Sequence, residues 1–294
     1  MQSPVFLLGV GAQKAGTSWL WQYLKRHPQC AIGEIKEYAI FNSVMMADTF
    51  PLRKRMRLKR LSILATQRLT QLEAGAEPDD HTEFLALMDN IALELDMTRY
   101  VPHFQDLLRR QPGTRLVADI TPEYCALSPD DFRTIRTMLT DGGFEVRVVY
   151  LMRDPVERCY SMMRMGERNA AREGAQKRNN AHERFAREAV QPWNEIRTRY
   201  DNTIRVLEQV FAPHELHFEF YERFISAEGT RALTSFLGID FVEPNLEFRA
   251  NASPRGSELG AESIAIVREF YDPVYRFCAD RFGADTVREL WKHA

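Results

Sequence analysis

The chain has few cysteines, no long apolar run and almost no excess of charge. Cys30, Cys125, Cys159 and Cys278 are scattered without a CxxC pair, which predicts neither a zinc site nor a disulfide framework and favours a reducing cytoplasm. No stretch reaches the ~18 apolar residues that span a bilayer, and the N-terminus lacks a basic leader, so we expect neither a transmembrane segment nor a signal peptide. Lys and Arg (39) nearly balance Asp and Glu (41), which excludes a whole-surface basic field for nucleic acid.

The rest of the composition is that of a globular protein, with 45% hydrophobic and 27% charged residues over 294 positions. Short apolar runs that predict buried strands alternate with helix patterns. The strands are expected at 5–10, 116–119, 146–151 and 216–220, and the helices at 17–25, 130–139, from 155 onward and at about 229–237. This alternation predicts a parallel α/β sheet with helices on both faces, in one domain (1–294) with a helical insertion at about 50–112, broken at 78–80. Such folds bind ligands at the carboxyl ends of their strands.

The strongest local signal is the loop 9–19, Gly-Val-Gly-Ala-Gln-Lys-Ala-Gly-Thr-Ser-Trp, between the first strand and the first helix. Its glycines let the backbone approach a ligand, the helix N-terminus offers N–H groups, and Lys14 adds a positive charge. It is not a Walker A loop, because Thr17 stands where the lysine belongs, and Lys14 also breaks the Rossmann GxGxxG pattern. The loop predicts a phosphate site; a glycine-rich turn with an incidental lysine is the alternative.

A second strand-to-helix junction carries Arg153 at the carboxyl end of the strand at 146–151. Asp154 and Pro155 are typical of the N-cap and first position of a helix, and Ser161 lies two helical turns further on. A guanidinium and a hydroxyl in this arrangement can share one phosphate. Taken alone, the junction favours an arginine that pairs with Asp154 or Glu157.

Lys-Ala-Gly-Thr-Ser-Trp at 14–19 resembles the 5'-phosphosulfate loop of sulfotransferases that use 3'-phosphoadenosine 5'-phosphosulfate (PAPS), and Arg153 with Ser161 has the spacing of that family's 3'-phosphate motif. The Arg-Asp-Pro-x-Glu-Arg run at 153–158 is similar to the heparan-sulfate branch. The resemblance implies a P-loop-like three-layer fold, PAPS as co-substrate without a metal, and 3',5'-ADP as product. It implies nucleotide contacts from Lys14, Ala15, Gly16, Thr17, Ser18, Trp19, Arg153, Ser161 and, in a late loop, Arg255 and Gly256.

Two further segments resemble the acceptor side of the family. Glu37, within Glu-Ile-Lys-Glu-Tyr-Ala-Ile-Phe at 34–41, matches the catalytic glutamate of the heparan-sulfate branch, with Ala39 in place of the usual histidine. The segment 119–124, Asp-Ile-Thr-Pro-Glu-Tyr, resembles the lining of the acceptor cleft. Its Ile120 replaces a lysine, which counts against a heparan-like acceptor.

The resemblance implies that Lys14 stabilises the bridging oxygen and that Glu37 takes the proton of an acceptor hydroxyl on a carbohydrate, lipid or small molecule. It further implies acceptor contacts from Tyr38, Pro122 and Tyr124. Glu34, or a histidine such as His103, is the alternative base.

Two basic segments leave alternatives open. Residues 53–60 carry six basic side chains, which fit an anionic acceptor, a carrier protein or a membrane surface, although a solvated helix is the simpler interpretation. Residues 164–187 fit a flap over the acceptor. The sequence carries no signal for the oligomeric state. The rival functions are a P-loop kinase-type phosphotransferase, disfavoured by the misplaced lysine and the lack of a clear Walker B aspartate, and a non-catalytic nucleotide-binding protein.

Overall fold

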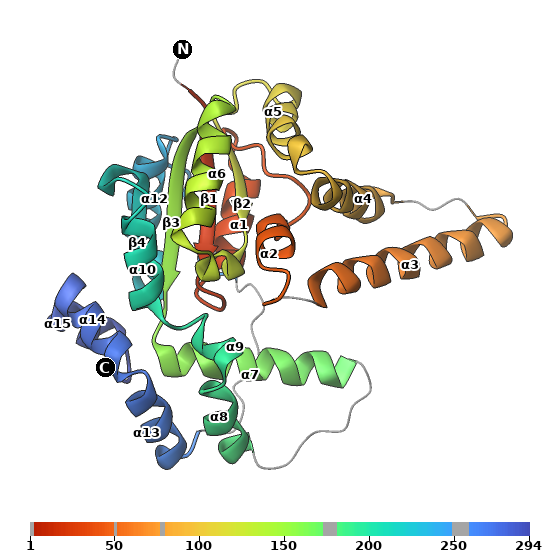
Figure 1. The fold of residues 1–294 in the computed structure, drawn as a ribbon. Helices are drawn as coiled ribbons and strands as arrows, with labels where there is room; N and C mark the ends of the chain where they lie inside the picture. Colours follow the sequence, from red (N-terminus) through yellow and green to blue (C-terminus); the bar gives the residue numbers. More distant parts are fainter. Residues whose placement is uncertain (1–2, 50–51, 77–79, 173–180, 249–258) are drawn as a thin grey trace.

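The structure, a computed structural model, describes residues 3–49, 52–76, 80–172, 181–248 and 259–294. Its centre is a parallel sheet in the order β2-β1-β3-β4 (Figure 1). The strands are β1 (Val5–Gly11), β2 (Leu116–Ile120), β3 (Glu145–Met152) and β4 (Leu216–Phe220). Every residue of β1 and β2 is buried, as expected of strands covered on both faces. The predicted α/β fold with a central parallel sheet is confirmed, and all four predicted strands are present.

Helices flank this sheet, and those predicted near 17–25, 130–139, 155 and 229–237 are found. They are α1 (Thr17–Lys25), α6 (Pro129–Asp141), α7 (Pro155–Arg172) and α12 (Ala227–Leu237). The sequence analysis did not single out the remaining short helices of the body and of the C-terminal part. These are α2 (Ile40–Met45), α8 (Ala181–Ala189), α9 (Pro192–Glu195), α10 (Tyr200–Glu208), α11 (Tyr221–Phe224), α13 (Ala261–Phe270), α14 (Asp272–Phe282), α15 (Ala284–Leu290) and the 3-10 turns η1 (Met97–Arg99), η2 (Pro122–Ala126) and η3 (Pro213–Glu215).

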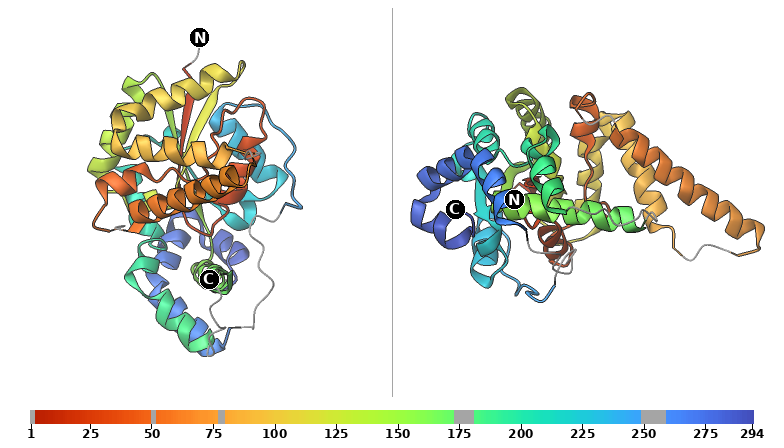
Figure 2. Two further views of the ribbon diagram at one scale, coloured as in Figure 1. Left: turned by 90° about the vertical axis from the view of Figure 1, so that its right-hand side faces the viewer. Right: turned by 90° about the horizontal axis from the view of Figure 1, so that it is seen from below.

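Two helices, α3 (Leu52–Glu73) and α4 (Thr82–Leu95), leave the body together on one side (Figures 1 and 2). They lie within the expected insertion at 50–112, and α5 (Tyr100–Arg110) then returns beside β2. The basic run 53–60 forms the first turns of α3. Most of the expected break at 78–80 lies outside the described residues, as does the middle of the basic segment 164–187.

The junction between β3 and α7 is anchored by one buried carboxylate. Asp154 Oδ1 accepts the N–H groups of Val156 (2.9 Å) and Glu157 (3.1 Å), which confirms the predicted N-cap. The same carboxylate accepts the Tyr275 hydroxyl (3.0 Å) and the N–H of His293 (2.8 Å). The C-terminal helices are therefore tied to the turn that presents Arg153.

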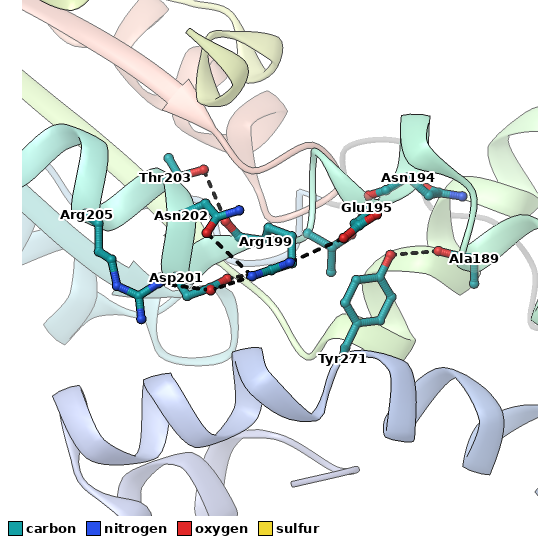
Figure 3. Close-up of polar contacts among 10 residues, drawn as sticks. Ala189, Asn194, Glu195, Arg199, Asp201, Asn202, Thr203, Arg205 and Tyr271 are labelled. Atoms are coloured by element: carbon teal, nitrogen blue, oxygen red, sulfur yellow. Dashed lines mark hydrogen bonds and ion pairs between the residues drawn. The ribbon is translucent and has the colours of Figure 1, made fainter. Parts of the chain in front are cut away.

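A polar network fixes the start of α10 (Figure 3). The Arg199 guanidinium donates to both oxygens of Asp201 (2.9 Å each) and contacts Glu195 at 3.3 Å. The neighbouring Tyr200 donates its hydroxyl to the carbonyl of Arg153 at 2.8 Å. Side chains far along the chain thus hold the backbone of Arg153 in place.

Candidate active site

A cavity of about 320 Å³ lies beyond the carboxyl ends of β1 and β3, the position at which α/β sheets bind ligands. It brings together both predicted nucleotide motifs and the predicted base. Its lining comprises Gln13, Lys14, Gly16, Thr17, Ser18, Trp19, Lys36, Glu37, Pro122, Arg153, Ser161, Arg164, Met165, Tyr221, Ile225, Leu246 and Phe248. Lys14, Glu37, Arg153 and Ser161 therefore face one common space, although they are far apart in the sequence.

The loop between β1 and α1 presents backbone donors to this cavity. Gly16 is the N-cap of α1 with φ of 97°, and a Cβ there would lie 3.1 Å from the Tyr221 ring, so glycine is required on both counts. No side chain caps α1, so the N–H groups of Thr17 and Ser18 are available to a ligand, whereas the Trp19 N–H donates to the Gly16 carbonyl at 2.9 Å. Together with the positive end of the helix dipole, this is a built anion site.

Lys14 has left-handed backbone geometry (φ 73°), and its Nζ lies 3.6 Å from Met165 Sδ. Burial, together with the nearby charges of Arg168, Lys36, Arg153 and Arg164, lowers the pKa of Lys14 from its ordinary 10.5 to about 8. Cations crowded in this way repel one another until an anion enters. The cavity is therefore electrostatically suited to a polyanion.

Arg153 connects the two predicted motifs. Its guanidinium donates to the carbonyl of Lys14 at 3.3 Å and lies over the Tyr221 ring at 4.7 Å from the centroid. The alternative pairing with Glu157 is also present, at 3.5 Å, yet Arg153 still lines the cavity beside Ser161. The ion pair of Arg153 with Glu157 is therefore compatible with a role of Arg153 in binding a phosphate.

The loop that carries Glu37 is held by its neighbour Tyr38. The Tyr38 carbonyl accepts Asn90 Nδ2 of α4 at 3.1 Å and also the guanidinium of Arg57 of α3. The Tyr38 hydroxyl lies 3.0 Å from His103 Nε2 of α5. Three helices of the predicted insertion thus fix the residue next to Glu37.

A second set of bonds holds the same loop from the sheet. The N–H of Ala39, which has left-handed geometry (φ 51°), donates to Thr121 Oγ1 at 3.1 Å. Thr121 in turn donates to buried Asp119 at 2.6 Å, and Asp119 also accepts the hydroxyls of Tyr100 (2.9 Å) and Tyr124 (2.7 Å). Burial raises the pKa of Asp119 to about 6, although the three donors oppose that shift. The network connects the end of β2 to the Glu37 loop.

At Glu37 itself, Lys36 Nζ lies 2.7 Å from Oε1. The alternative bases lie elsewhere: Glu34 pairs with Lys25, and His103 contacts Tyr38. Neither is in the cavity lining.

Some predicted contacts are not brought to the cavity. The side chains of Tyr38 and Tyr124 are buried behind its wall, whereas Pro122 lines it, so acceptor contact through the two tyrosines stays a prediction. Ala15 is buried and outside the lining. Arg255 and Gly256 lie outside the described residues.

The sequence analysis missed several lining residues, including the cations Lys36 and Arg164. A usable signal was present in α7, because Ser161, Arg164 and Met165 are spaced three and four apart and so share one helix face. Tyr221 and Phe248 carried no comparable local signal.

Fold and cavity together define an α/β protein that can hold a polyanion next to a carboxylate. The chain belongs to the sulfotransferase family, since the model of the Sulfotransferase family matches residues 4–243.

Solved structures are similar to this chain, and the first of them supports the fold. A sulfotransferase from Alicyclobacillus acidocaldarius is 18% identical with a TM-score of 0.56, covering 95% of this chain and 96% of that one. The sulfotransferase domain from the curacin biosynthetic pathway is 18% identical with a TM-score of 0.42, covering 84% and 77%. Mouse sulfotransferase SULT7A1 complexed with PAP is 12% identical with a TM-score of 0.36, covering 83% and 62%.

No curated protein sequence matches this chain. Nothing in these comparisons bears on the heparan-sulfate branch, so that finer resemblance stays a prediction. Within the described ranges, no helix has the length and apolar character needed to cross a bilayer.

Proposed function

We propose that the protein transfers a sulfuryl group from PAPS to an acceptor hydroxyl and releases 3',5'-ADP. The observation that carries this proposal is the single cavity shared by Lys14, Glu37, Arg153 and Ser161. In the reaction, the acceptor oxygen forms a bond to sulfur while the bond from sulfur to the 5'-phosphate oxygen breaks. The acceptor proton goes to a carboxylate, and the departing phosphate takes the electron pair.

Lys14 and the start of α1 act on the leaving group. Negative charge grows on the 5'-phosphate as the bond to sulfur breaks, and fixed donors aimed at that charge lower the barrier. Burial and the neighbouring cations together depress the pKa of Lys14 to about 8, and a bound phosphate counteracts both effects. Binding the nucleotide thus stabilises the charged form of Lys14 that the reaction needs.

Arg153 and Ser161 select the 3'-phosphate, with Arg164 on the same wall. Trp19 and Phe248 line both this cavity and a second one of about 250 Å³, so the adenine fits where the two cavities meet. Aromatic faces at that point supply stacking for a flat base.

Glu37 is the base that accepts the proton of the attacking hydroxyl, and Lys36 orients its carboxylate through the contact at 2.7 Å. The acceptor is a hydroxyl on a carbohydrate, a lipid or a small molecule. The four cysteines are buried and free, which supports the cytoplasm as the compartment in which the protein works.

Calorimetry and a transfer assay test this proposal together. We expect 3',5'-ADP to bind more tightly than ATP with Mg²⁺, and labelled PAPS to transfer its sulfuryl group to at least one hydroxyl compound in an acceptor panel. Tighter binding of ATP with Mg²⁺ would point to a phosphotransferase. Tight binding of 3',5'-ADP without transfer to any acceptor would point to a non-catalytic nucleotide-binding protein.

A further inference from the structure

The hairpin of α3 and α4 (Figures 1 and 2) carries a concentration of exposed apolar side chains. Eight of the fourteen large apolar side chains that are exposed in the described part of the chain belong to these two helices. On a monomeric surface, such side chains are usually scattered singly, whereas a contiguous group of them marks an interaction site.

Of the five exposed apolar residues of α3, Leu58, Leu69 and Leu72 lie to one side of the face that meets α4, whereas Met56 and Ile63 lie to the other side. Arg57 pairs with Glu94 of α4, and Arg68 lies over a ring of α4, so both mark the face turned toward that helix. Leu58 and Leu69, 49% and 57% exposed, directly follow these two arginines. Each is therefore rotated by about 100° from the shared face, in the same sense.

The same pattern holds on α4. Phe84 and Glu94 receive the two arginines of α3, and Leu85 and Leu95, 55% and 70% exposed, directly follow them. The start of α3 pairs with the end of α4, so the helices run antiparallel. Equal rotations in antiparallel helices point to the same side, so both apolar stripes lie on one face of the hairpin, here called the hairpin face.

The spacing on the hairpin face suits packing against other helices. Leu58, Ala65 and Leu72 on α3 are seven residues apart, and so are Met88 and Leu95 on α4. A seven-residue apolar repeat is the pattern of helices that interlock side by side.

The two helices also differ in charge. α3 contains seven Lys and Arg and a single Glu, whereas α4 contains three acidic residues and no basic one. Lys59 and Asp89 are exposed on their helices. Along the hairpin, Lys59 lies two residues and Asp89 five residues from the Arg57–Glu94 pair, so the two charges are offset by about 5 Å along the helix axes.

We propose that the chain forms a two-fold symmetric dimer through the hairpin face, with α3 of each protomer packed against α4 of its partner. A two-fold axis along the hairpin brings Lys59 within about one helical turn of the partner's Asp89 along the axis, at the rim of the apolar contact, where the long lysine side chain can reach it. The same patch serves both copies, as a closed symmetric dimer requires. This dimer is independent of the catalytic proposal.

Light scattering after size-exclusion chromatography tests the dimer. We expect the full chain to have about twice the mass of 34.2 kDa at micromolar concentration. The double variant Leu69→Glu/Met88→Glu buries charge in the interface, so its dissociation constant should rise by about a hundredfold or more. Ile63→Glu is the matched control. Ile63 is 40% exposed, but it is rotated from the face shared with α4 in the opposite sense to Leu58 and Leu69, so this variant should leave the dimer intact.

A charge exchange keeps the test informative if the double variant folds poorly. Asp89→Lys should weaken the dimer about tenfold, and adding Lys59→Glu should restore it. A wild-type chain that stays monomeric at about 100 μM would overturn the proposal. So would an unchanged mass for the double variant. Monomeric protein that sediments with phosphatidylglycerol vesicles, but not with phosphatidylcholine vesicles, would assign the hairpin face to a lipid surface instead.

Discussion

Two parts of the cavity lining are built in different ways. They are the nucleotide wall, which carries Lys14, Arg153 and Ser161, and the acceptor wall, which carries Glu37. The nucleotide wall consists of two strand-to-helix turns, and the residues that face the ligand lie within a few positions of each turn. The acceptor wall is one loop whose geometry is imposed by distant residues: Asn90, His103 and Thr121 all bond to Tyr38 or Ala39. The comparison indicates that, in the proposed mechanism, phosphate binding depends on short local segments, whereas placement of the proposed base depends on distant parts of the fold.

The largest effect is expected at the nucleotide wall. Lys14→Ala should lower turnover by about a thousandfold, because the charge that develops on the leaving phosphate loses its nearest cation. Lys25→Ala is the matched control, since Lys25 follows on α1 but pairs with Glu34 away from the cavity. Transfer rates from labelled PAPS measure both variants. Near-normal turnover in Lys14→Ala would remove this lysine from the mechanism.

On the acceptor wall, Glu37→Gln should lower the maximal rate by about a hundredfold or more while the affinity for 3',5'-ADP stays the same, because only proton removal is lost. Glu34→Gln, three residues earlier in the same segment, should keep the wild-type rate. Steady-state kinetics and calorimetry separate the two effects. An unchanged rate in Glu37→Gln would move the base elsewhere.

A smaller effect tests whether the hairpin positions the base. The forked guanidinium of Arg57 contacts both the Tyr38 carbonyl and Glu94, and the single ammonium of Arg57→Lys cannot replace both contacts. Because Tyr38 is next to the proposed base, kcat should fall by about tenfold while the nucleotide affinity stays unchanged. Arg60→Lys on the same helix, which pairs only with exposed Glu83 among the described contacts, should stay within about twofold of wild type. Equal kcat values for the two variants would show that the acceptor wall does not depend on the hairpin.

The smallest effect is a pH dependence of binding. The pKa of Lys14 is lowered to about 8, so its charge is present below that pH and is lost above it. Affinity of the free protein for 3',5'-ADP should therefore decline as the pH rises through about 8, and this decline should be absent in Lys14→Ala. Calorimetry across pH 6.5–9.5 measures it, and identical profiles for the two proteins would contradict the assignment.

The same lysine affects stability in the opposite direction. Between pH 8 and its ordinary pKa of 10.5, the unfolded chain holds the Lys14 proton more tightly than the folded one. The contribution of Lys14 to the free energy of unfolding of the unliganded protein should thus rise with pH in this window.

The nucleotide wall could be predicted from the sequence better than the acceptor wall, for the same physical reason. The strands, the Gly16 turn and the cap at Asp154 could be predicted because their signals are periodicity and spacing within one short segment. Arg57 and Asn90 could not, because their partner is a backbone carbonyl that any residue at position 38 would offer. The expected acceptor role of Tyr124 illustrates the limit, since its hydroxyl is used by buried Asp119.

The central claim is that one cavity holds the two phosphates of a single nucleotide at separate turns. Its most direct test compares the affinities of 3',5'-ADP and 5'-AMP in wild type and in Arg153→Ala. We predict that wild type prefers 3',5'-ADP by about a hundredfold, and that Arg153→Ala removes most of that preference while binding 5'-AMP nearly as before. Equal losses of affinity for both nucleotides would contradict the account.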